Sequence, residues 1–376
     1  MELTVRPVRS PEDREAFLRF PWVVYESHPL WVPPLLSEER QRFDRKRHPF
    51  FEQGEAEWFL AFQDRALCGR ICVALDARFE RSWGVKAAWF GAFECRDQTE
   101  VAQALIDHAM AWARERGATE VRGPAYFTMN DQCGLLIDGF DSPPPLLMPY
   151  NPAYYAGLLE AAGFLKDKDL VSYQTTEAPG ERFCRMADRA RARGGFTTRG
   201  FDPRRYDDEI KLIQTLYNQS WRDNWGAVPM SDREMAALAG EIRPFADFEL
   251  IRFAFAGERP VALCLSIPDI NPILKKLDGR MGLLGILRFL WERRRVKGVR
   301  TILLGVIPEF RARGLDVILT TESVRIGLGR GYTSVEMGWT LEDNHLINDY
   351  LAELGTPSRR FRIYRRSLDS RNAAQA

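Results

Sequence analysis

Residues 302–315, ILLGVIPEFRARGL, combine an apolar run, a proline and a turn that carries two arginines. The apolar run ends at Pro308, and the chain passes Arg311 and Arg313 before a helical pattern begins after Gly314. A strand that turns into a helix in this way presents successive backbone N–H groups and a positive helix end, which favours an anion such as a pyrophosphate. Gly314 lets phosphates approach the backbone, and the arginines add positive charge. The segment predicts an anion site, beside the plainer alternative of a cationic surface turn; its residues are Arg311, Ala312, Arg313, Gly314 and Leu315.

A second group of polar side chains lies further along the chain, in the segment NHLINDY. Asn344 is a short polar side chain at a predicted strand-to-helix junction, where it can cap the helix. His345 and Asp349 are four residues apart, so on a helix they share one face and can pair. His345 is the only candidate for a neutral-pH base close to the predicted anion site. An ordinary helix surface would show the same spacing, and both interpretations stay open.

The length and charge of the chain limit the classes of protein to which it can belong. At 376 residues it is about twice the usual domain length, and its 45% of apolar residues excludes wholesale disorder. The net charge is +1, but residues 280–376 hold seventeen Lys and Arg against ten Asp and Glu, so they carry +7 and the rest −6. The C-terminal part could therefore hold an anionic ligand. Its arginines are too dispersed to predict specific nucleic-acid binding.

Several other functions are not supported by the sequence. The start MELTVRPVRS has no apolar signal-peptide core, and no run of about 18 apolar residues occurs, so we expect a cytoplasmic protein that does not span a membrane. The six cysteines and four histidines are dispersed, which predicts reduced structural thiols and no metal site. The glycine-rich stretch 327–332 follows a helical run and is expected to end that helix rather than to bind a phosphate.

Two stretches of the chain share one order of patterns. Residues 101–123 have apolar positions at helical spacing, a glycine and a short strand-like run, and residues 315–338 repeat this order. Each stretch is followed by a segment that starts with asparagine and ends in a helical pattern and glycine, and is preceded by strand-like runs around a turn signal. Two copies of one α/β plan would explain the doubled length. We place the boundary in the polar stretch 176–196, which predicts domains at 1–180 and 181–368 and a disordered tail at 369–376.

The segment from Val306 to Gly314 resembles the opening of the acyl-CoA motif of the GNAT superfamily of N-acyltransferases, V-x-P-E-[YF]-R-x-[RK]-G. The helix, the Gly-Tyr turn, the strand and the Asn344 segment follow in the order and spacing of that family. More narrowly, the whole chain resembles the long tandem GNAT-like bacterial proteins that include the bacterial ceramide synthase group. The segments that carry this likeness are WVVYESHPLWVPPL, ATEVRGPAYFTMND with NPAYY, and FRIYRR.

The resemblance implies an α/β (α+β) fold of two tandem GNAT-like domains, each a mixed, mostly antiparallel sheet flanked by helices. It also implies acyl-CoA as co-substrate, an amine acceptor and no metal. The first half lacks the R-x-x-G turn, so we expect a degenerate domain that shapes the substrate site, and a second domain that binds the donor. The second half departs from the pattern at Asp316, where the family has another glycine; a carboxylate there suits the helix start but repels a phosphate.

Single residues gain roles from the resemblance. In the family the strand before the motif splays from its neighbour, and a backbone N–H there polarises the thioester carbonyl. Leu304, Gly305 and Val306 occupy this place, with the Gly305 backbone as the catalytic candidate; a glycine also suits a β-bulge. Asn344 is expected to bind the amides of the donor's pantetheine arm.

The family's proton donor is a tyrosine seven positions after the asparagine. This position is Leu351 here, and Tyr350 comes one residue earlier, which turns a helical side chain by about 100°. Tyr350 as general acid and Tyr350 as a structural residue therefore both stay open.

Other segments bear on the acceptor. Residues 281–295, MGLLGILRFLWERRR, predict a helix that could touch an anionic bilayer or guide an acyl chain; the sequence favours a core-facing helix with a solvated basic end. Asp131 and Glu94 are acidic candidates in the first half. Aromatic residues near the N-terminus either line an apolar substrate cavity or join the domains: Trp22, Tyr25, Trp31, Phe50 and Phe51.

We therefore expect an acyl-CoA-dependent N-acyltransferase, with transfer of a fatty acyl group to a long-chain, sphingoid-type amine as the narrower hypothesis. An acyl carrier protein would present the same pantetheine arm. Peripheral contact with the inner membrane follows if the 281–295 helix meets a bilayer. The alternative is a non-catalytic GNAT-fold binding or regulatory protein, which Asp316 and the displaced Tyr350 favour.

Overall fold

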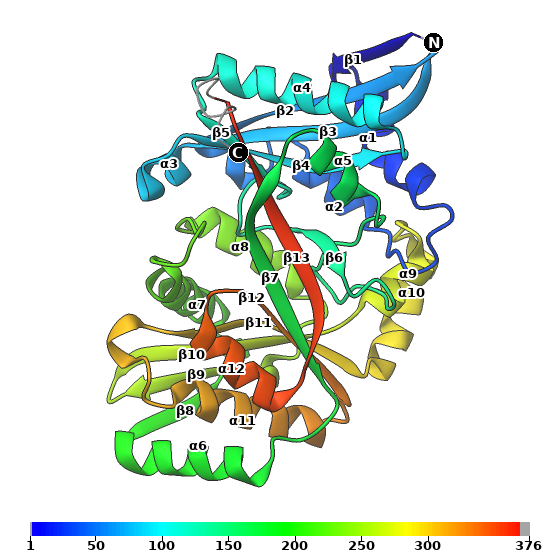
Figure 1. Ribbon diagram of the computed structural model, residues 1–376. Coiled ribbons are helices and arrows are strands. Elements are labelled where there is room, and N and C mark those ends of the chain that lie inside the picture. Colours follow the sequence, from blue (N-terminus) through cyan, green and yellow to red (C-terminus); the bar gives the residue numbers. More distant parts are fainter. Residues whose placement is uncertain (1, 369–376) are drawn as a thin grey trace. The chain divides into compact units, whose positions relative to one another are not determined.

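The computed structural model describes residues 2–368, and the chain forms two compact units (Figure 1). Unit 1 consists of residues 2–170, 274–285 and 359–368, and unit 2 of residues 171–273 and 286–358. The chain crosses between the units four times, within β7 (Leu165–Thr175), α9 (Asn271–Leu277), α10 (Leu283–Glu292) and β13 (Thr356–Ser367). The predicted tail at 369–376 lies outside the described residues. The boundary predicted near residue 180 concerns the two repeats in the sequence, whereas the division into units concerns compactness. That boundary therefore stays a prediction.

Unit 1 is built on the strand order β1-β2-β3-β4-β5-β13, with β6 also paired to β13. The β4–β5 pair is parallel, whereas β1–β2, β2–β3, β3–β4 and β13–β5 are antiparallel. The strands are β1 (Leu3–Pro7), β2 (Gly54–Gln63), β3 (Ala66–Asp76), β4 (Ala87–Cys95), β5 (Glu120–Gly123) and β6 (Leu135–Asp138). The helices are α1 (Pro11–Val24), α2 (Leu36–Arg42), α3 (Ala77–Trp83), α4 (Thr99–Glu115) and α5 (Tyr155–Ala161).

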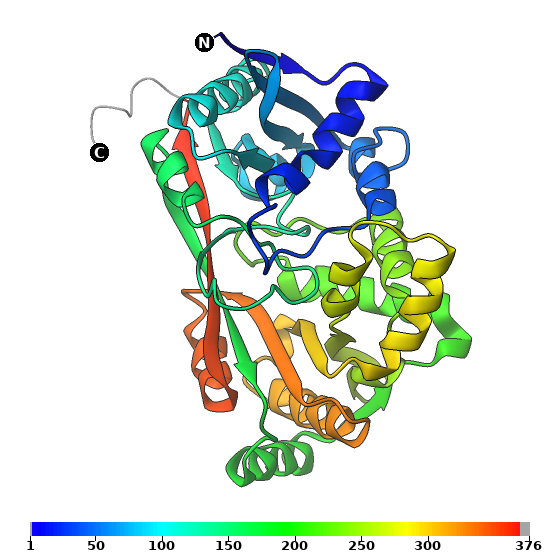
Figure 2. The same ribbon diagram turned by 90° about the vertical axis from the view of Figure 1, so that its right-hand side faces the viewer.

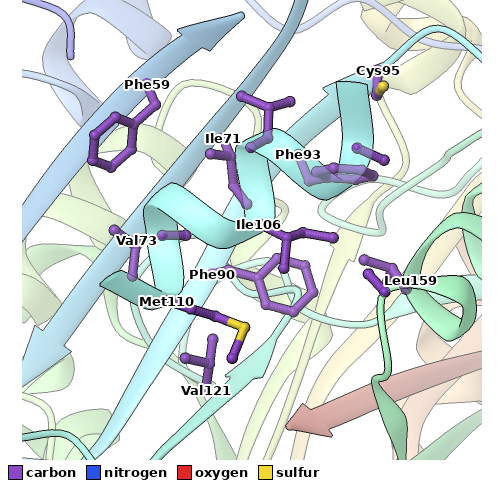
Figure 3. Packing of buried hydrophobic residues seen from close by; sticks show 14 of the residues in the cluster. Phe59, Ile71, Val73, Phe90, Phe93, Cys95, Ile106, Met110, Val121 and Leu159 are labelled. Carbon is purple, nitrogen blue, oxygen red and sulfur yellow. The ribbon is translucent and has the colours of Figure 1, made fainter. Parts of the chain in front are cut away.

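The core of unit 1 follows the two-residue period of its strands. Phe59, Ile71 and Val73 point to the face covered by α4, where they pack against Ile106 and Met110 (Figure 3). The alternate residues of β2 and β3 face α1 on the other side of the sheet. A tight turn at Asp64 and Arg65, both with positive φ, joins the two strands, as the turn signal there predicts. The hairpin thus supplies apolar side chains to both layers.

Unit 2 has the strand order β7-β12-β11-β10-β9-β8. In Figure 1, α6 and α11 lie on one face of these strands and α7 on the other, and Figure 2 shows α6 and α11 below the strands from the side. The strands are β8 (Phe196–Gly200), β9 (Ile251–Ala256), β10 (Arg259–Pro268), β11 (Gly298–Val306) and β12 (Ser334–Leu341). The helices that lie wholly in unit 2 are α6 (Glu181–Gly194), α7 (Tyr206–Trp221), α8 (Asp232–Ile242), α11 (Leu315–Gly329) and α12 (His345–Leu354). Helices α9 (Asn271–Leu277) and α10 (Leu283–Glu292) each contain residues of both units.

The predicted fold class is confirmed, since each unit is a mixed, mostly antiparallel sheet flanked by helices. The expected helix-then-strand pairs are α4 with β5 and α11 with β12, and α11 ends at the glycine-rich stretch where Gly331 has φ +85°. The six cysteines are thiols that form no disulfide within residues 2–368. Within residues 2–368, no helix has the length and hydropathy needed to cross a membrane.

Helix α10 contradicts the favoured interpretation of residues 281–295. Its leucines do not face a core: Leu283 is 84% exposed and Leu284 is 83% exposed. The residues that the helix does bury are Phe289 and Glu292. The sequence pattern has a strongly apolar face but does not say which side that face will meet, and here the apolar face is solvent-exposed.

The aromatic residues near the N-terminus pack within unit 1. The rings of Tyr25 and Trp31 stack with centroids 4.6 Å apart, and Phe50 stacks on Phe127 at 4.7 Å. Trp22 meets Trp31 edge-on at 5.3 Å and donates from Nε1 to Asp278 Oδ1 at 2.8 Å. These contacts are structural, and a role in lining a substrate cavity stays a prediction.

Candidate functional site

Strand β11 separates from its parallel neighbour halfway along its length. It pairs with β12 only from Gly298 to Thr301, whereas its antiparallel pairing with β10 continues to Val306. Among the described residues no strand pairs with Ile302–Val306 on the β12 side. The backbone of this half-strand therefore has one edge open to a ligand.

A β-bulge sits where the separation begins. Thr301 pairs with Ser266 and Leu303 with Leu265, so Ile302 is the extra residue on β11. The predicted bulge at Gly305 is wrong, because Gly305 pairs regularly with Leu263. A bulge bends its strand and increases the local twist, which accounts for the loss of pairing with β12 directly after Thr301.

The register determines which N–H groups face the open edge. Ile307 N donates to Val261 O at 3.0 Å, so residues 307, 305 and 303 direct their N–H groups toward β10. The alternation turns the N–H groups of Leu304 and Val306 toward the open edge. The Gly305 N–H, expected to polarise a carbonyl, points away from that edge, and its two neighbours are better placed.

Gly305 is required for packing. A Cβ at this position would lie 2.4 Å from Cζ3 of Trp221 and 3.0 Å from Cβ of Ser220, so the end of α7 rests directly on the β11 backbone. The Ser220 hydroxyl oxygen is buried and has no hydrogen-bond partner in the described part of the chain. Trp221 and Ser220 were not found from the sequence, because their contact spans 84 residues and no local pattern marks it.

In the turn before α11, the backbone is better placed to meet an anion than the side chains of the two arginines. Arg311 donates from Nη2 to Ser220 O at 2.8 Å and from Nε to Val306 O at 3.4 Å, so its guanidinium holds the turn against α7 and β11. Arg313 lies over the Phe310 ring at 4.7 Å.

The backbone before α11 is left-handed at two residues. Ala312 and Gly314 have φ of +58° and +78°, and α11 begins at Leu315 with no side-chain cap. An uncapped helix start preceded by left-handed residues is a favourable anion site.

Asp316 modifies this anion site. Its carboxylate lies at the start of α11, where the backbone N–H groups of Val317 and Asp316 favour its charged form. Partial burial nevertheless raises the pKa of Asp316 above its usual value. A phosphate at this turn would lie beside the Asp316 carboxylate and would compete with it for the N–H groups of the helix start.

The predicted proton donor lies at the same helix start. Tyr350 OH donates to Asp316 O at 3.2 Å, while Leu351 is buried with Met337 and Tyr173. Leu351 therefore packs in the core, whereas Tyr350 faces α11. Burial raises the pKa of Tyr350 well above 10, and the charge of Asp316 adds to this shift.

The other polar residues of α12 are less engaged. His345 and Asp349 are exposed, and no hydrogen bond joins them in the described structure. Asn344 makes no side-chain cap, contrary to expectation. Asn348 stabilises the junction instead, donating from Nδ2 to Leu341 O at 2.9 Å and Glu342 O at 3.2 Å. Within residues 2–368 no three His, Cys, Asp or Glu side chains gather as a metal site would require.

Comparison with known proteins identifies the architecture. No family model matches the chain. The tandem GNAT protein from the clavulanic acid biosynthesis pathway shares the fold with a TM-score of 0.56 at 15% identity, over 99% of this chain and 100% of that one. The bacterial ceramide synthase of Caulobacter vibrioides is 30% identical over 98% of both chains. This chain belongs to the family of that synthase, and its fold is that of the tandem GNAT protein. A further relative is protein YghO of Escherichia coli K12, 29% identical over 97% of this chain and 95% of YghO.

Unit 1 shows the same separation of two parallel strands, but tyrosine side chains bond the end of its separated strand. β4 pairs with β5 only from Ala87 to Trp89, and β4 bulges at Ala92, whose φ is +46°. At its far end Cys95 N donates to Tyr155 Oη at 2.9 Å, and Tyr154 OH donates to Cys95 O at 2.8 Å. Two tyrosine hydroxyls thus satisfy backbone groups at the end of β4.

The acidic candidates of the first GNAT unit differ in their surroundings. Glu94 is buried, accepts from Tyr155 OH at 2.7 Å and lies 3.6 Å from Arg70. Burial raises the pKa of Glu94 above its usual value. Asp131 lies in the loop after β5, where Thr128 Oγ1 donates to it at 3.5 Å. Glu94 is therefore part of a buried structural network rather than an exposed base.

Proposed function

We propose that this chain is an acyl-CoA-dependent N-acyltransferase whose donor lies along the open edge of β11. The observation that carries the proposal is the separation of β11 from β12 after Thr301, directly ahead of the uncapped start of α11. The N–H groups of Leu304 and Val306 would meet the amides and the thioester of the donor. The backbone from Ala312 to Leu315 would meet its pyrophosphate.

The groups at this edge fit the chemistry of acyl transfer. The amine nitrogen attacks the thioester carbonyl carbon, a C–N bond forms, the C–S bond breaks, and the amine loses a proton while the thiolate gains one. A backbone N–H from Leu304 or Val306 would stabilise the charge that develops on the carbonyl oxygen. Tyr350, whose hydroxyl acts as a hydrogen-bond donor at the start of α11, would donate a proton to the thiolate. His345, exposed at the start of α12, is the candidate to accept the amine proton.

A buried hydroxyl beside β11 favours a ligand at the open edge of this strand. The buried Ser220 hydroxyl has no partner in the described residues and lies against Gly305, where a polar ligand atom could satisfy it. The absence of a Cβ at Gly305 and Gly314 brings the backbone close to its neighbours on both sides of the site.

The narrower substrate class rests on the likeness to one relative. That protein is named a bacterial ceramide synthase and aligns with 98% of this chain, so we propose a fatty acyl donor and a sphingoid-type amine for this chain as well. The test is thiol release from acetyl-, octanoyl- and palmitoyl-CoA, each with sphinganine or with small amines. Turnover of palmitoyl-CoA with sphinganine is expected. Turnover restricted to acetyl-CoA and small amines would overturn the lipid class and keep the enzyme class.

A non-catalytic binding protein is the second candidate. The hydrogen bond from Arg311 to Ser220 O and the carboxylate of Asp316 at the helix start favour it. Binding of acyl-CoA without thiol release from any pair in the panel would establish this alternative. Because an acyl carrier protein presents the same pantetheine arm, the panel should include a palmitoylated carrier protein before turnover is considered absent.

A further inference from the structure

We propose that α10 and the arginine turn after it dock the protein on an anionic lipid bilayer. We call these residues the α10 surface, which consists of Leu283, Leu284, Ile286, Leu287, Leu290, Trp291 and Arg293–Arg295. The proposal does not depend on the acyltransferase activity, because it concerns how the protein meets a membrane and not what it transfers there.

The α10 helix turns its apolar face outward. Leu283, Leu287 and Leu290 recur at helical spacing and are 84%, 64% and 47% exposed. Phe289 and Glu292, three residues apart on the opposite side, are the positions that the helix buries. Surface helices ordinarily do the reverse, with the apolar stripe on the core. A contiguous apolar face of this kind marks a surface that is covered in the working state of the protein.

Positive charge borders the apolar face. Residues 275–297 contain eight Lys and Arg against two Asp and Glu. Both acids are engaged within the fold: Arg288 Nε donates to Glu292 Oε1 at 2.9 Å, and Asp278 accepts from Trp22. Arg293, Arg294 and Arg295 are exposed at the end of the helix. Basic residues beside apolar ones match anionic headgroups above acyl chains.

Trp291 adds a residue type suited to the same boundary. It is 59% exposed, and the Arg295 guanidinium lies 3.7 Å from its ring centroid. Tryptophan prefers the level of the headgroups, where its ring is half in hydrocarbon and its N–H can reach water. With ten residues, α10 is about 15 Å long, too short to cross a bilayer of about 30 Å, so it would lie in the plane of the interface.

The charge pattern favours a bilayer over a second copy of the chain. A twofold contact uses the same patch on both copies, so it would bring two sets of Arg293–Arg295 together. An anionic bilayer neutralises these arginines and takes up the leucines in one contact.

The experiment is flotation of the full chain with vesicles, in the absence of any substrate. Vesicles of phosphatidylcholine with phosphatidylglycerol should carry the protein upward, and vesicles of phosphatidylcholine alone should carry much less. The double variant Leu284→Ser with Leu287→Ser should lower the bound fraction at limiting lipid by about tenfold or more. The pair Arg293→Gln with Arg294→Gln should lower it on anionic vesicles only, and added salt should act like this variant.

The matched control is Leu165→Ser, which removes a leucine that is 60% exposed outside the α10 surface and should leave flotation unchanged. Trp291→Phe should abolish the blue shift of tryptophan emission on vesicle addition. Equal flotation of the leucine pair and the wild type would overturn the proposal, as would dimerisation through α10 shown by light scattering without lipid. Loss of flotation with normal thiol release in detergent would separate this surface from the active site.

Discussion

The hydroxyl of Tyr350 donates to the main-chain carbonyl of Asp316 at 3.2 Å, which joins α12 to the first turn of α11. The two residues belong to segments 34 positions apart. They place a phenol that stays protonated at neutral pH beside the helix start at which the donor's pyrophosphate is proposed to bind. In the structure this hydroxyl proton forms a hydrogen bond to the Asp316 carbonyl. As a general acid, Tyr350 would transfer it to the leaving thiolate.

Replacement of Tyr350 by Phe distinguishes a general acid from a structural residue. We expect kcat for thiol release to fall about a hundredfold, because a positioned general acid contributes at least that much. The dissociation constant of the acyl-CoA should hardly change, and unfolding in urea should show a loss of only about 1 kcal/mol from the missing hydrogen bond. A fall in stability with unchanged kcat would make Tyr350 a structural residue.

The Asp316→Asn variant tests the competition at the helix start through its pH dependence. Burial raises the pKa of Asp316 in the folded protein above 3.8, so the folded state holds the proton more tightly than the unfolded state. Its contribution to stability is therefore present below pH 3.8 and is lost as the pH rises through the raised pKa. The Asn variant should not lose stability in this way. The difference in free energy of unfolding, variant minus wild type, should therefore be larger at pH 7 than at pH 4.

The same variant should bind acyl-CoA more tightly at pH 7, by about tenfold, because a carboxylate near the phosphates is removed. Titration calorimetry of both proteins at the two pH values measures this difference. Equal affinities would mean that the phosphates bind away from Asp316.

Gly314→Ala and Gly195→Ala form a matched pair. Both glycines have positive φ, so each alanine should cost about 1 kcal/mol of stability from the strained backbone. Only at Gly314 would the added Cβ also meet another atom, Ala190 Cβ at 2.7 Å. We expect acyl-CoA affinity to fall at least about tenfold for Gly314→Ala, and to be kept in Gly195→Ala. A loss in both variants would indicate general damage to unit 2.

Tyr155→Phe tests the edge of the separated strand of unit 1. The change removes the donor to Glu94 and the acceptor of the Cys95 N–H, so about 1–3 kcal/mol of stability should be lost. Urea denaturation followed by circular dichroism measures this. Unchanged stability would show that the tyrosine hydroxyl does not hold this edge.

The sequence was sufficient for the elements and insufficient for their contacts. Helical spacing and turn signals predicted α4, α11, α12 and the hairpins, because these patterns are local. The bulge was expected at Gly305 but lies at Ile302, since a bulge depends on the register of a partner strand that the pattern does not contain. The packing of Trp221 on Gly305 is equally non-local.

Side-chain directions were the least predictable part of the site. Arg311 was expected to meet a phosphate and instead donates to Ser220 O and Val306 O. Helix α10 shows the same limit, because its apolar face was expected to pack inward and is exposed. Composition and spacing identify which residues share a face, and tertiary contacts decide what that face meets.

The central claim is that the open edge of β11 binds an acyl-CoA, and calorimetric titration with palmitoyl-CoA tests it most directly. The wild type should bind one molecule per chain, since two tyrosine hydroxyls already bond the backbone of Cys95 at the end of the equivalent strand of unit 1. Gly305→Ala, whose Cβ would lie 2.4 Å from the Trp221 ring, should lose this binding. Gly329→Ala, where nothing lies within 4 Å, should keep it. Absence of binding to the wild type by palmitoyl-CoA and by acetyl-CoA, or full binding by a folded Gly305→Ala variant, would contradict the account.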